Sequence, residues 1–153
     1  MDKIDARILS ELQVDGRVRW SRLSERVNLS ASACQRRIEA LVAQGVIRNF
    51  TVNLNEAALG HHVTAFVSVS IDRQNTASAK QFRRWVRSQP RVQACHMLTG
   101  DVDFMLQVVA ADLESLGSFL EAELLNLPAV KDASTSIVLN EVKPKRTMVT
   151  GGW

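Results

Sequence analysis

The sequence predicts an α+β protein with two domains, an N-terminal winged helix-turn-helix followed by a C-terminal ferredoxin-like βαββαβ domain. The prediction rests on a change of pattern near residue 50 of the 153-residue chain. Before that point, three stretches place apolar residues at helical spacing. After it, segments with strand-like alternation are interleaved with helical ones. We expect a helix-turn-helix domain over 1–48, a linker strand over 49–60, a second domain over 61–143 and a tail over 144–153.

The first helix is expected from about Lys3 to Gln13. Asp2 precedes it as a candidate N-cap, and Asp5 stands three residues later, as in a capping box. Asp15 and Gly16 follow, and glycine commonly ends a helix. This stretch therefore predicts a capped surface helix that packs on the two helices after it.

The next two helices are separated by a tight link. A short helix is expected from about Ser21, taken as its N-cap, to Val27, and Asn28 tolerates the left-handed backbone of a turn. The third helix is expected to be capped by Ser30, to run to about Gln44 and to stop at Gly45. Its buried stripe is expected to be Cys34, Ile38, Leu41 and Val42. After it, 46–47 and 50–52 are expected to be extended, as a wing or as a strand that leads to the second domain.

The second domain is predicted to hold four strands and two helices. The strands form one antiparallel sheet, and both helices lie on the same face of it. The expected strands are 61–71, 92–99, 103–110 and 130–141. The expected helices are 76–89, which Pro90 ends, and one capped by Asp112 and closed by Pro128. Their expected buried residues are Ala79, Phe82, Trp85 and Val86 in the first, and Leu113, Leu116, Leu120, Leu124 and Leu127 in the second.

Positive charge is concentrated in the first third of the chain. Residues 1–50 carry nine Lys/Arg and six Asp/Glu, a balance of +3, whereas residues 51–153 carry ten of each. Binding to the DNA backbone needs positive charge gathered locally. The excess therefore favours double-stranded DNA as the partner of the helix-turn-helix.

Helix three has an outward face that suits base recognition. Ser32, Gln35, Arg36 and Glu39 fall opposite the apolar stripe, and Arg37 lies at its flank. Arginine can donate two hydrogen bonds to guanine, and glutamine can pair with adenine. We expect Gln35 and Arg36 to read bases, and Arg22, Arg26 and Arg37 to hold phosphates. The full expected DNA-binding set is Arg17, Arg19, Ser21, Arg22, Arg26, Ser30, Ser32, Gln35, Arg36 and Arg37.

These segments resemble the Lrp/AsnC family of leucine-responsive, or feast/famine, regulators of bacteria and archaea. The first half resembles its DNA-binding part in "IDARILSELQVDGR" and "LSERVNLSASACQRRIEALVAQGVI", and "CHMLTGDVDFML" is similar to the family's Gly-Asp-x-Asp-Tyr segment. The resemblance covers nearly the whole chain. The sequence departs from the family in two ways: Ala31 and Ala33 stand where proline is frequent, and Phe104 stands in place of the tyrosine.

The resemblance implies a transcriptional regulator that dimerises through its sheets and assembles further, often to octamers. It also implies a small effector, frequently an amino acid, bound between regulatory domains. Gly100, Asp101 and Asp103 match the loop at that site, together with Thr135 and Ser136 of the last strand. Binding there would shift assembly or DNA affinity, provided that the effector prefers one state.

Other functions remain as alternatives. A regulator without an effector is one, and a small ferredoxin-like enzyme is another, although Cys95 and His96 would point to opposite faces of a strand. The cysteines and histidines show no zinc spacing, so we expect no metal and no cofactor. An interaction module that does not bind DNA would differ in lacking steep salt dependence. With two cysteines and no long apolar run, we expect a cytoplasmic protein with no membrane segment.

Overall fold

The computed structural model describes residues 1–72 and 76–143. The chain divides into two compact units, one that takes in Met1–Asn53 and one that takes in Leu54–Val142. The division falls inside the linker expected over 49–60. The expected tail, 144–153, lies outside the described residues. Among the described residues, no helix is long and apolar enough to cross a membrane.

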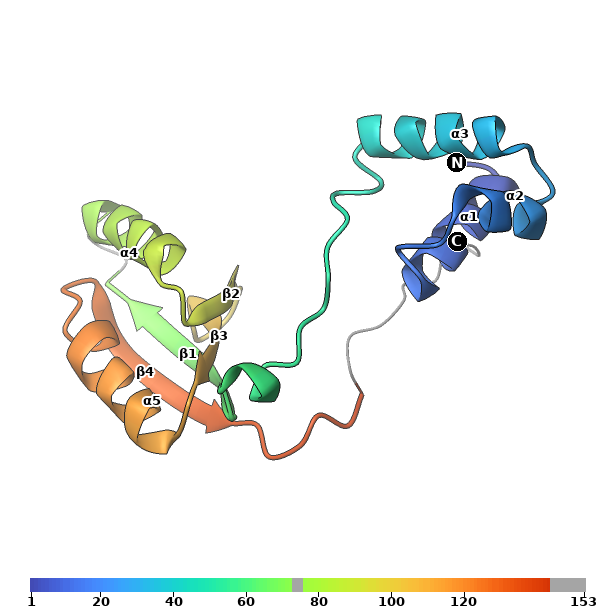
Figure 1. Ribbon diagram of the computed structural model, residues 1–153. Helices are drawn as coiled ribbons and strands as arrows, with labels where there is room; N and C mark the ends of the chain where they lie inside the picture. Colours follow the sequence, from blue (N-terminus) through green and yellow to red (C-terminus); the bar gives the residue numbers. More distant parts are fainter. Residues whose placement is uncertain (73–75, 144–153) are drawn as a thin grey trace. The chain divides into compact units, whose positions relative to one another are not determined.

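The first unit holds three helices, α1 (Lys3–Val14), α2 (Trp20–Val27) and α3 (Ala31–Ala43) (Figure 1). The expected capping box at Asp2 is present, since its side chain accepts from the amide of Asp5 and the side chain of Asp5 accepts in return. Ser30 caps α3, with its hydroxyl accepting from the amide of Ala33 at 3.2 Å. The expected cap of α2 is wrong: Arg19 is its N-cap, because the amide of Leu23 already donates to the Arg19 carbonyl and places Ser21 inside the helix.

The core of the first unit fixes how α3 is rotated about its axis. Cys34, Ile38 and Leu41 are buried and face Ile8 and Leu23 of the other two helices. Val42, expected in the same stripe, is 45% exposed. Val42 lies about 100° around the helix from Leu41, so the core takes one of the two side chains and leaves the other in solvent.

Residues with positive φ end two of the three helices of this unit. Asn28 has φ 56° and closes α2, as expected for the tight link. Gly45, with φ 71°, follows α3. No strand lies between the end of α3 and residue 63, a stretch that the structure describes in full, so the expected wing and linker strand are not formed. Phe50, Val52 and Leu54 are exposed there, without a paired strand to cover them.

Arg37 ties α3 to the start of α1. Its guanidinium donates to the carboxylates of both Asp2 and Asp5 at 2.7 Å. The amide of Asp5 and the Arg37 guanidinium hold the pKa of Asp2 below its ordinary value. Asp5 and then Asp2 raise the pKa of Arg37 in turn. The capping box of α1 and the flank of α3 therefore form one connected polar network.

The second unit is the expected ferredoxin-like fold. Its antiparallel sheet has the order β2-β3-β1-β4. The strands are β1 (Val63–Ile71), β2 (Val92–Met97), β3 (Phe104–Ala110) and β4 (Val130–Ile137). Helices α4 (Thr76–Ser88) and α5 (Leu113–Phe119) pack on one face, and α5 passes into a π-helical turn, Leu120–Leu124. The strands β2 and β4 end earlier than expected.

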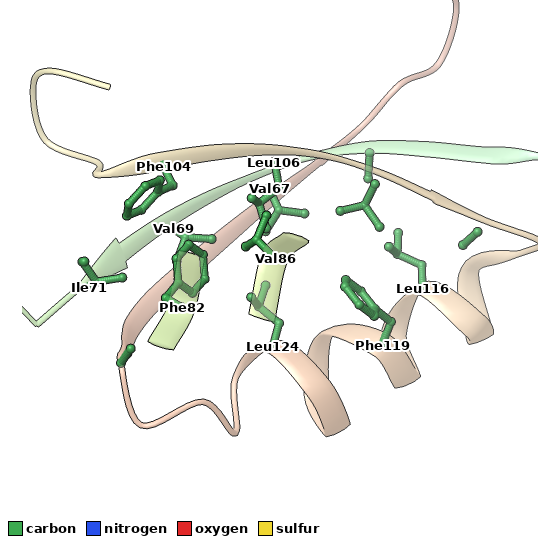
Figure 2. Close-up of a cluster of buried hydrophobic side chains, with 14 residues drawn as sticks. Val67, Val69, Ile71, Phe82, Val86, Phe104, Leu106, Leu116, Phe119 and Leu124 are labelled. Carbon is green, nitrogen blue, oxygen red and sulfur yellow. The ribbon is translucent and has the colours of Figure 1, made fainter. Parts of the chain in front are cut away.

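One face of the sheet and both helices share a single apolar core. Figure 2 shows Leu116, Phe119 and Leu124 pointing toward the sheet. The ring of Phe82 in α4 is fully buried, with its centroid 4.9 Å from that of Phe104. Leu113, expected in this core, is 61% exposed. It is the first residue after the N-cap Asp112, where the helix has only begun to approach the sheet.

Replacing Phe82 by alanine tests this core. Phe82→Ala leaves a cavity between α4 and β3, and we expect it to lower the free energy of unfolding by about 3–5 kcal/mol. Urea unfolding followed by circular dichroism measures the change. Leu113→Ala is the matched control, with an expected change within about 0.5 kcal/mol because Leu113 is exposed. Equal losses in the two variants would contradict this description of the core.

Removing the charge of Arg37 tests the network between α1 and α3. A carboxylate with a lowered folded pKa stabilises the protein above its ordinary pKa, and that stability is lost as the pH falls through the folded value. We expect Arg37→Met to lower Tm at neutral pH, with the difference from wild type closing as the pH falls through the lowered pKa of Asp2. Thermal melts from pH 2 to 8 measure it. Arg36→Met is the control and should leave Tm unchanged at every pH.

Candidate DNA-binding face and effector site

The exposed face of α3 carries the residues expected to read bases. Ser32, Gln35, Arg36 and Glu39 are all exposed, opposite the buried stripe. Gln35 Nε2 donates to Glu39 Oε1 at 2.9 Å, one helical turn along. Arg36 has neither a hydrogen-bond partner nor an ion-pair partner among the described residues. Its five donors are therefore available to a ligand that approaches this face.

A second group of cations lies at the start of α2. Arg17, Arg19 and Arg22 are exposed and line a shallow hollow of about 570 Å³, together with Ser21. Asp15 and Glu25 also border it, so the hollow is not uniformly positive. The hydroxyls of Ser30 and Ser32 lie 3.1 Å apart at the start of α3. Backbone amides and hydroxyls of this kind are common partners of DNA phosphates.

Two of the arginines expected to hold phosphates are engaged within the protein. Arg26 forms an ion pair with Glu11, and its carbonyl accepts from Arg7 Nη2 at 2.6 Å. Arg37 is bound by Asp2 and Asp5, as described above. Their charges are balanced by neighbouring carboxylates, whereas those of Arg17, Arg19, Arg22 and Arg36 lie on exposed side chains. Arg37 therefore supports α3 from its flank rather than facing outward.

The loop expected to meet an effector joins β2 to β3. Gly100 has φ 119°, a conformation that side chains rarely allow. Asp101 is exposed. Asp103 is half-buried and bound to the end of β1: its Oδ2 accepts from the amide of Ile71 at 2.9 Å, and its own amide donates to the Val69 carbonyl at 3.0 Å. The Asp103 carboxylate thus fixes the loop to the centre of the sheet.

Two hollows flank this loop. One, of about 480 Å³, is polar and is bordered by Asp72, Asp101, Asp103 and Lys131. The other, of about 370 Å³, lies toward α4 and is bordered by Arg83, Asp103 and several apolar side chains, Phe104 among them. Gly100 lines both. The two hollows give the loop two chemically different surroundings.

Thr135 and Ser136 do not join the loop within one chain. They pair with Val67 and Phe66 in β1 and therefore point to opposite faces of the sheet. Thr135 is opposite Val67, four residues before Ile71, which separates it from the loop by roughly 13 Å along the strand. Neither residue lines either hollow. A site made of all five expected residues is not present in a single chain.

The groups considered for catalysis or metal binding are separated. Cys95 lies opposite Leu106 and His96 opposite Met105, so the two side chains point to different faces of the sheet. Cys34 is buried in the first unit, where burial raises the pKa of its thiol. Within the part of the chain that the structure describes, no three His, Cys, Asp or Glu residues are grouped so as to hold a metal ion.

Arg83 and Lys131 also lie beside the loop, and neither was among the residues expected there. Arg83 follows Ala79 by one helical turn, next to the buried Phe82, so it stands at the boundary of the core-facing side of α4. This spacing from Ala79 and Phe82 is the one feature of the sequence from which the position of Arg83 could have been predicted. No feature of the sequence predicts that Lys131 lies beside the loop, because its proximity to Asp101 depends on how β4 pairs with β1.

Both units match family models. The AsnC-type helix-turn-helix domain matches residues 1–42, and the Lrp/AsnC ligand binding domain matches residues 64–148. The leucine-responsive regulatory proteins of Salmonella typhimurium LT2 and Escherichia coli K12 are each 36% identical to this chain over 149 residues. The match covers 97% of this chain and 91% of each relative.

Solved structures agree with these matches. A transcriptional regulator of Neisseria meningitidis, crystallised as a complex with L-Met, is 37% identical and superposes with a TM-score of 0.91, covering 94% of this chain and 93% of that one. An AsnC family regulator of Agrobacterium tumefaciens is 29% identical, with a TM-score of 0.89 and coverage of 97% and 96%. With its exposed α3 and its ligand-binding fold, this chain belongs to the Lrp/AsnC family of DNA-binding transcriptional regulators.

Proposed function

We propose that α3 enters the major groove of its DNA site and that Arg36 and Gln35 contact base edges there. The observation that carries the proposal is Arg36, an exposed arginine without a partner in the described residues, at the middle of a capped helix. Guanine O6 and N7 accept the two parallel bonds that a guanidinium donates. Gln35 reaches adenine by giving up its bond to Glu39, an exchange between two exposed side chains.

Phosphate contacts are assigned to the start of α2 and of α3. Arg17, Arg19 and Arg22, with the hydroxyl of Ser21, are placed to follow one strand of the backbone. Ser30 and Ser32 stand at the positive end of α3, where a phosphate is favoured. Arg26 contributes when its ion pair with Glu11 opens. Arg37 stays with Asp2 and Asp5 and holds α3 in place.

We further propose that the protein acts as a homodimer or a larger homo-oligomer, such as an octamer. A single helix-turn-helix makes a small interface, and two copies related by a two-fold axis read two half-sites. The open face of the sheet is available for such pairing, because both helices pack on the other face. Phe66 on that open face is 42% exposed.

The effector is proposed to be an amino acid that binds at the Gly100 loop. The loop offers an aspartate carboxylate for an ammonium group and a backbone with positive φ at Gly100. The Neisseria relative carries L-Met, which makes an amino acid the first class to test. Bound effector changes DNA affinity if it favours one assembly state over another. Thr135 and Ser136 take part only if a second subunit brings them to the loop.

Substitutions on α2 and α3 separate base reading from phosphate binding. The DNA site is first selected from a random duplex library. We expect Arg36→Ala to lose about 1–3 kcal/mol of binding free energy on that site and to relax its preference at one or two base pairs. Arg22→Ala should weaken binding to all duplexes alike and reduce the slope of log K against log salt by about one. The assignment is wrong if Arg22→Ala relaxes base preference while Arg36→Ala weakens binding uniformly.

Calorimetric titration with each of the twenty amino acids tests the effector. We expect at least one to bind, and at a concentration of 100 Kd it should stabilise the protein by about 2.7 kcal/mol, seen as a rise in Tm. The same amino acid should change the affinity for the selected duplex. If none of the twenty gives heat or a shift in Tm, the protein is a regulator without an amino-acid effector.

A further inference from the structure

The outer side of α4 carries a strip of positive charge. The helix contains no acidic residue, and its cations are Lys80, Arg83, Arg84 and Arg87. At about 100° per residue, these four positions fall within a single arc of about 100° around the helix. All four side chains are exposed. We call them the basic strip, a local excess of positive charge within residues 51–153, whose total charge is balanced.

The basic strip lies on the side of α4 that faces away from the core. Phe82 and Val86 are buried on the other side, and Trp85 is half-buried there. Among the described side chains of α4, no large apolar one is exposed. The centre of a protein–protein interface is apolar and poor in charged residues, whereas interfaces with DNA are polar and strongly positive. The composition of the strip therefore favours DNA as its partner.

The charges of the strip are not balanced by carboxylates within the chain. Every ion pair between described residues lies in the first unit. The guanidinium carbon of Arg83 lies 5.9 Å from the centroid of the Phe104 ring, and its Nη2 donates to the sulfur of Met97 at 3.4 Å. An aromatic ring and a thioether carry no formal charge, so these contacts orient Arg83 without neutralising it.

Three of the cations form a row that suits a DNA backbone. Lys80, Arg84 and Arg87 follow one another at intervals of four and three residues, which places them along one side of the helix. The row is about 10 Å long at about 1.5 Å per residue. A duplex carries about one negative charge per 1.7 Å of its axis, or about six over the length of the row. Contacts of this kind hold phosphates and carry no base preference.

The neighbouring helix offers the competing partner for the strip. The exposed acidic residues of α5 and its π-helical turn are Glu114, Glu121 and Glu123, and this segment has no cation. In a second copy of the chain these carboxylates would be complementary to α4. Exposed ion pairs contribute little, about 0–1 kcal/mol each, and α4 has no exposed apolar residue among those described to support such an interface. Binding to DNA gains in addition from the release of condensed counterions.

We propose that the basic strip of α4 is a second DNA-binding surface, which holds phosphates outside the base pairs that α3 contacts. Lys80, Arg84 and Arg87 contact the backbone, and Arg83 adds its charge from the edge of the strip. The surface strengthens binding to long DNA without changing sequence preference. The inference does not depend on which residues of α3 read the bases.

Binding of the full-length protein to two duplexes tests the proposal. One is trimmed to the selected site, and the other extends the same site on both sides with unrelated sequence. We expect wild type to bind the extended duplex more tightly. With Lys80→Gln, Arg84→Gln and Arg87→Gln combined, Kd for the extended duplex should rise about tenfold or more, and the slope of log K against log salt should fall by about two to three. Kd for the trimmed duplex should stay as in wild type.

A variant that keeps the charges is the matched control. Lys80→Arg, Arg84→Lys and Arg87→Lys combined should bind both duplexes like wild type, because phosphate contacts depend on charge. Both triple variants should melt like wild type without DNA, since the changed side chains are exposed. A loss of affinity in the charge-keeping variant that equals the loss in the neutral one would contradict the proposal.

The remaining outcomes separate this proposal from the others. If the neutral triple variant binds the extended duplex as tightly as wild type, or loses affinity equally on both duplexes, the second surface is overturned. Sedimentation without DNA should show the same assembly for wild type and the neutral variant. A smaller assembly in that variant and in the combination of Glu114→Gln, Glu121→Gln and Glu123→Gln would mean that α4 meets a second copy instead of DNA. Arg36→Ala should weaken both duplexes alike, so a failure of base reading is seen separately.

Discussion

The burial of Cys34, Ile38 and Leu41 is the constraint on which the DNA-binding half of the molecule depends. A helix of thirteen residues has no preferred rotation of its own, and these three side chains supply one by packing against α1 and α2. Once they are inside, Gln35 and Arg36 can only point outward. The base-reading face is therefore a consequence of the core.

Arg36 and Arg37 show how position decides the role of a side chain. They are adjacent and chemically identical, yet one step of about 100° around the helix separates them. Arg37 meets the capping box of α1 and neutralises it, whereas Arg36 meets solvent. Arg36 is therefore available to a negatively charged ligand, whereas Arg37 is already bound by carboxylates.

Much of the fold was predictable because local chemistry decides it. The caps at Asp2, Ser30 and Asp112, the turn at Asn28 and the order of strands and helices along the second unit all follow from residue type and period. The exposures of Val42 and Leu113 were not predictable, because periodicity shows which side chains share a face but not how far the core extends. The absence of a wing has a similar origin, since an extended segment becomes a strand only when another strand pairs with it. The grouping of Gly100 with Asp103 was predictable because one loop holds both residues, whereas Arg83 and Lys131 approach that loop from distant elements.

Replacing single atoms of the DNA tests most directly whether α3 reads the groove through Arg36. In the selected duplex, 7-deazaguanine is placed at each guanine in turn, which removes the N7 acceptor and leaves the Watson–Crick edge intact. The account predicts one position in each half-site where wild type loses about tenfold in affinity and Arg36→Ala loses nothing further. An equal loss in both proteins at every guanine, or no loss at any, would contradict it.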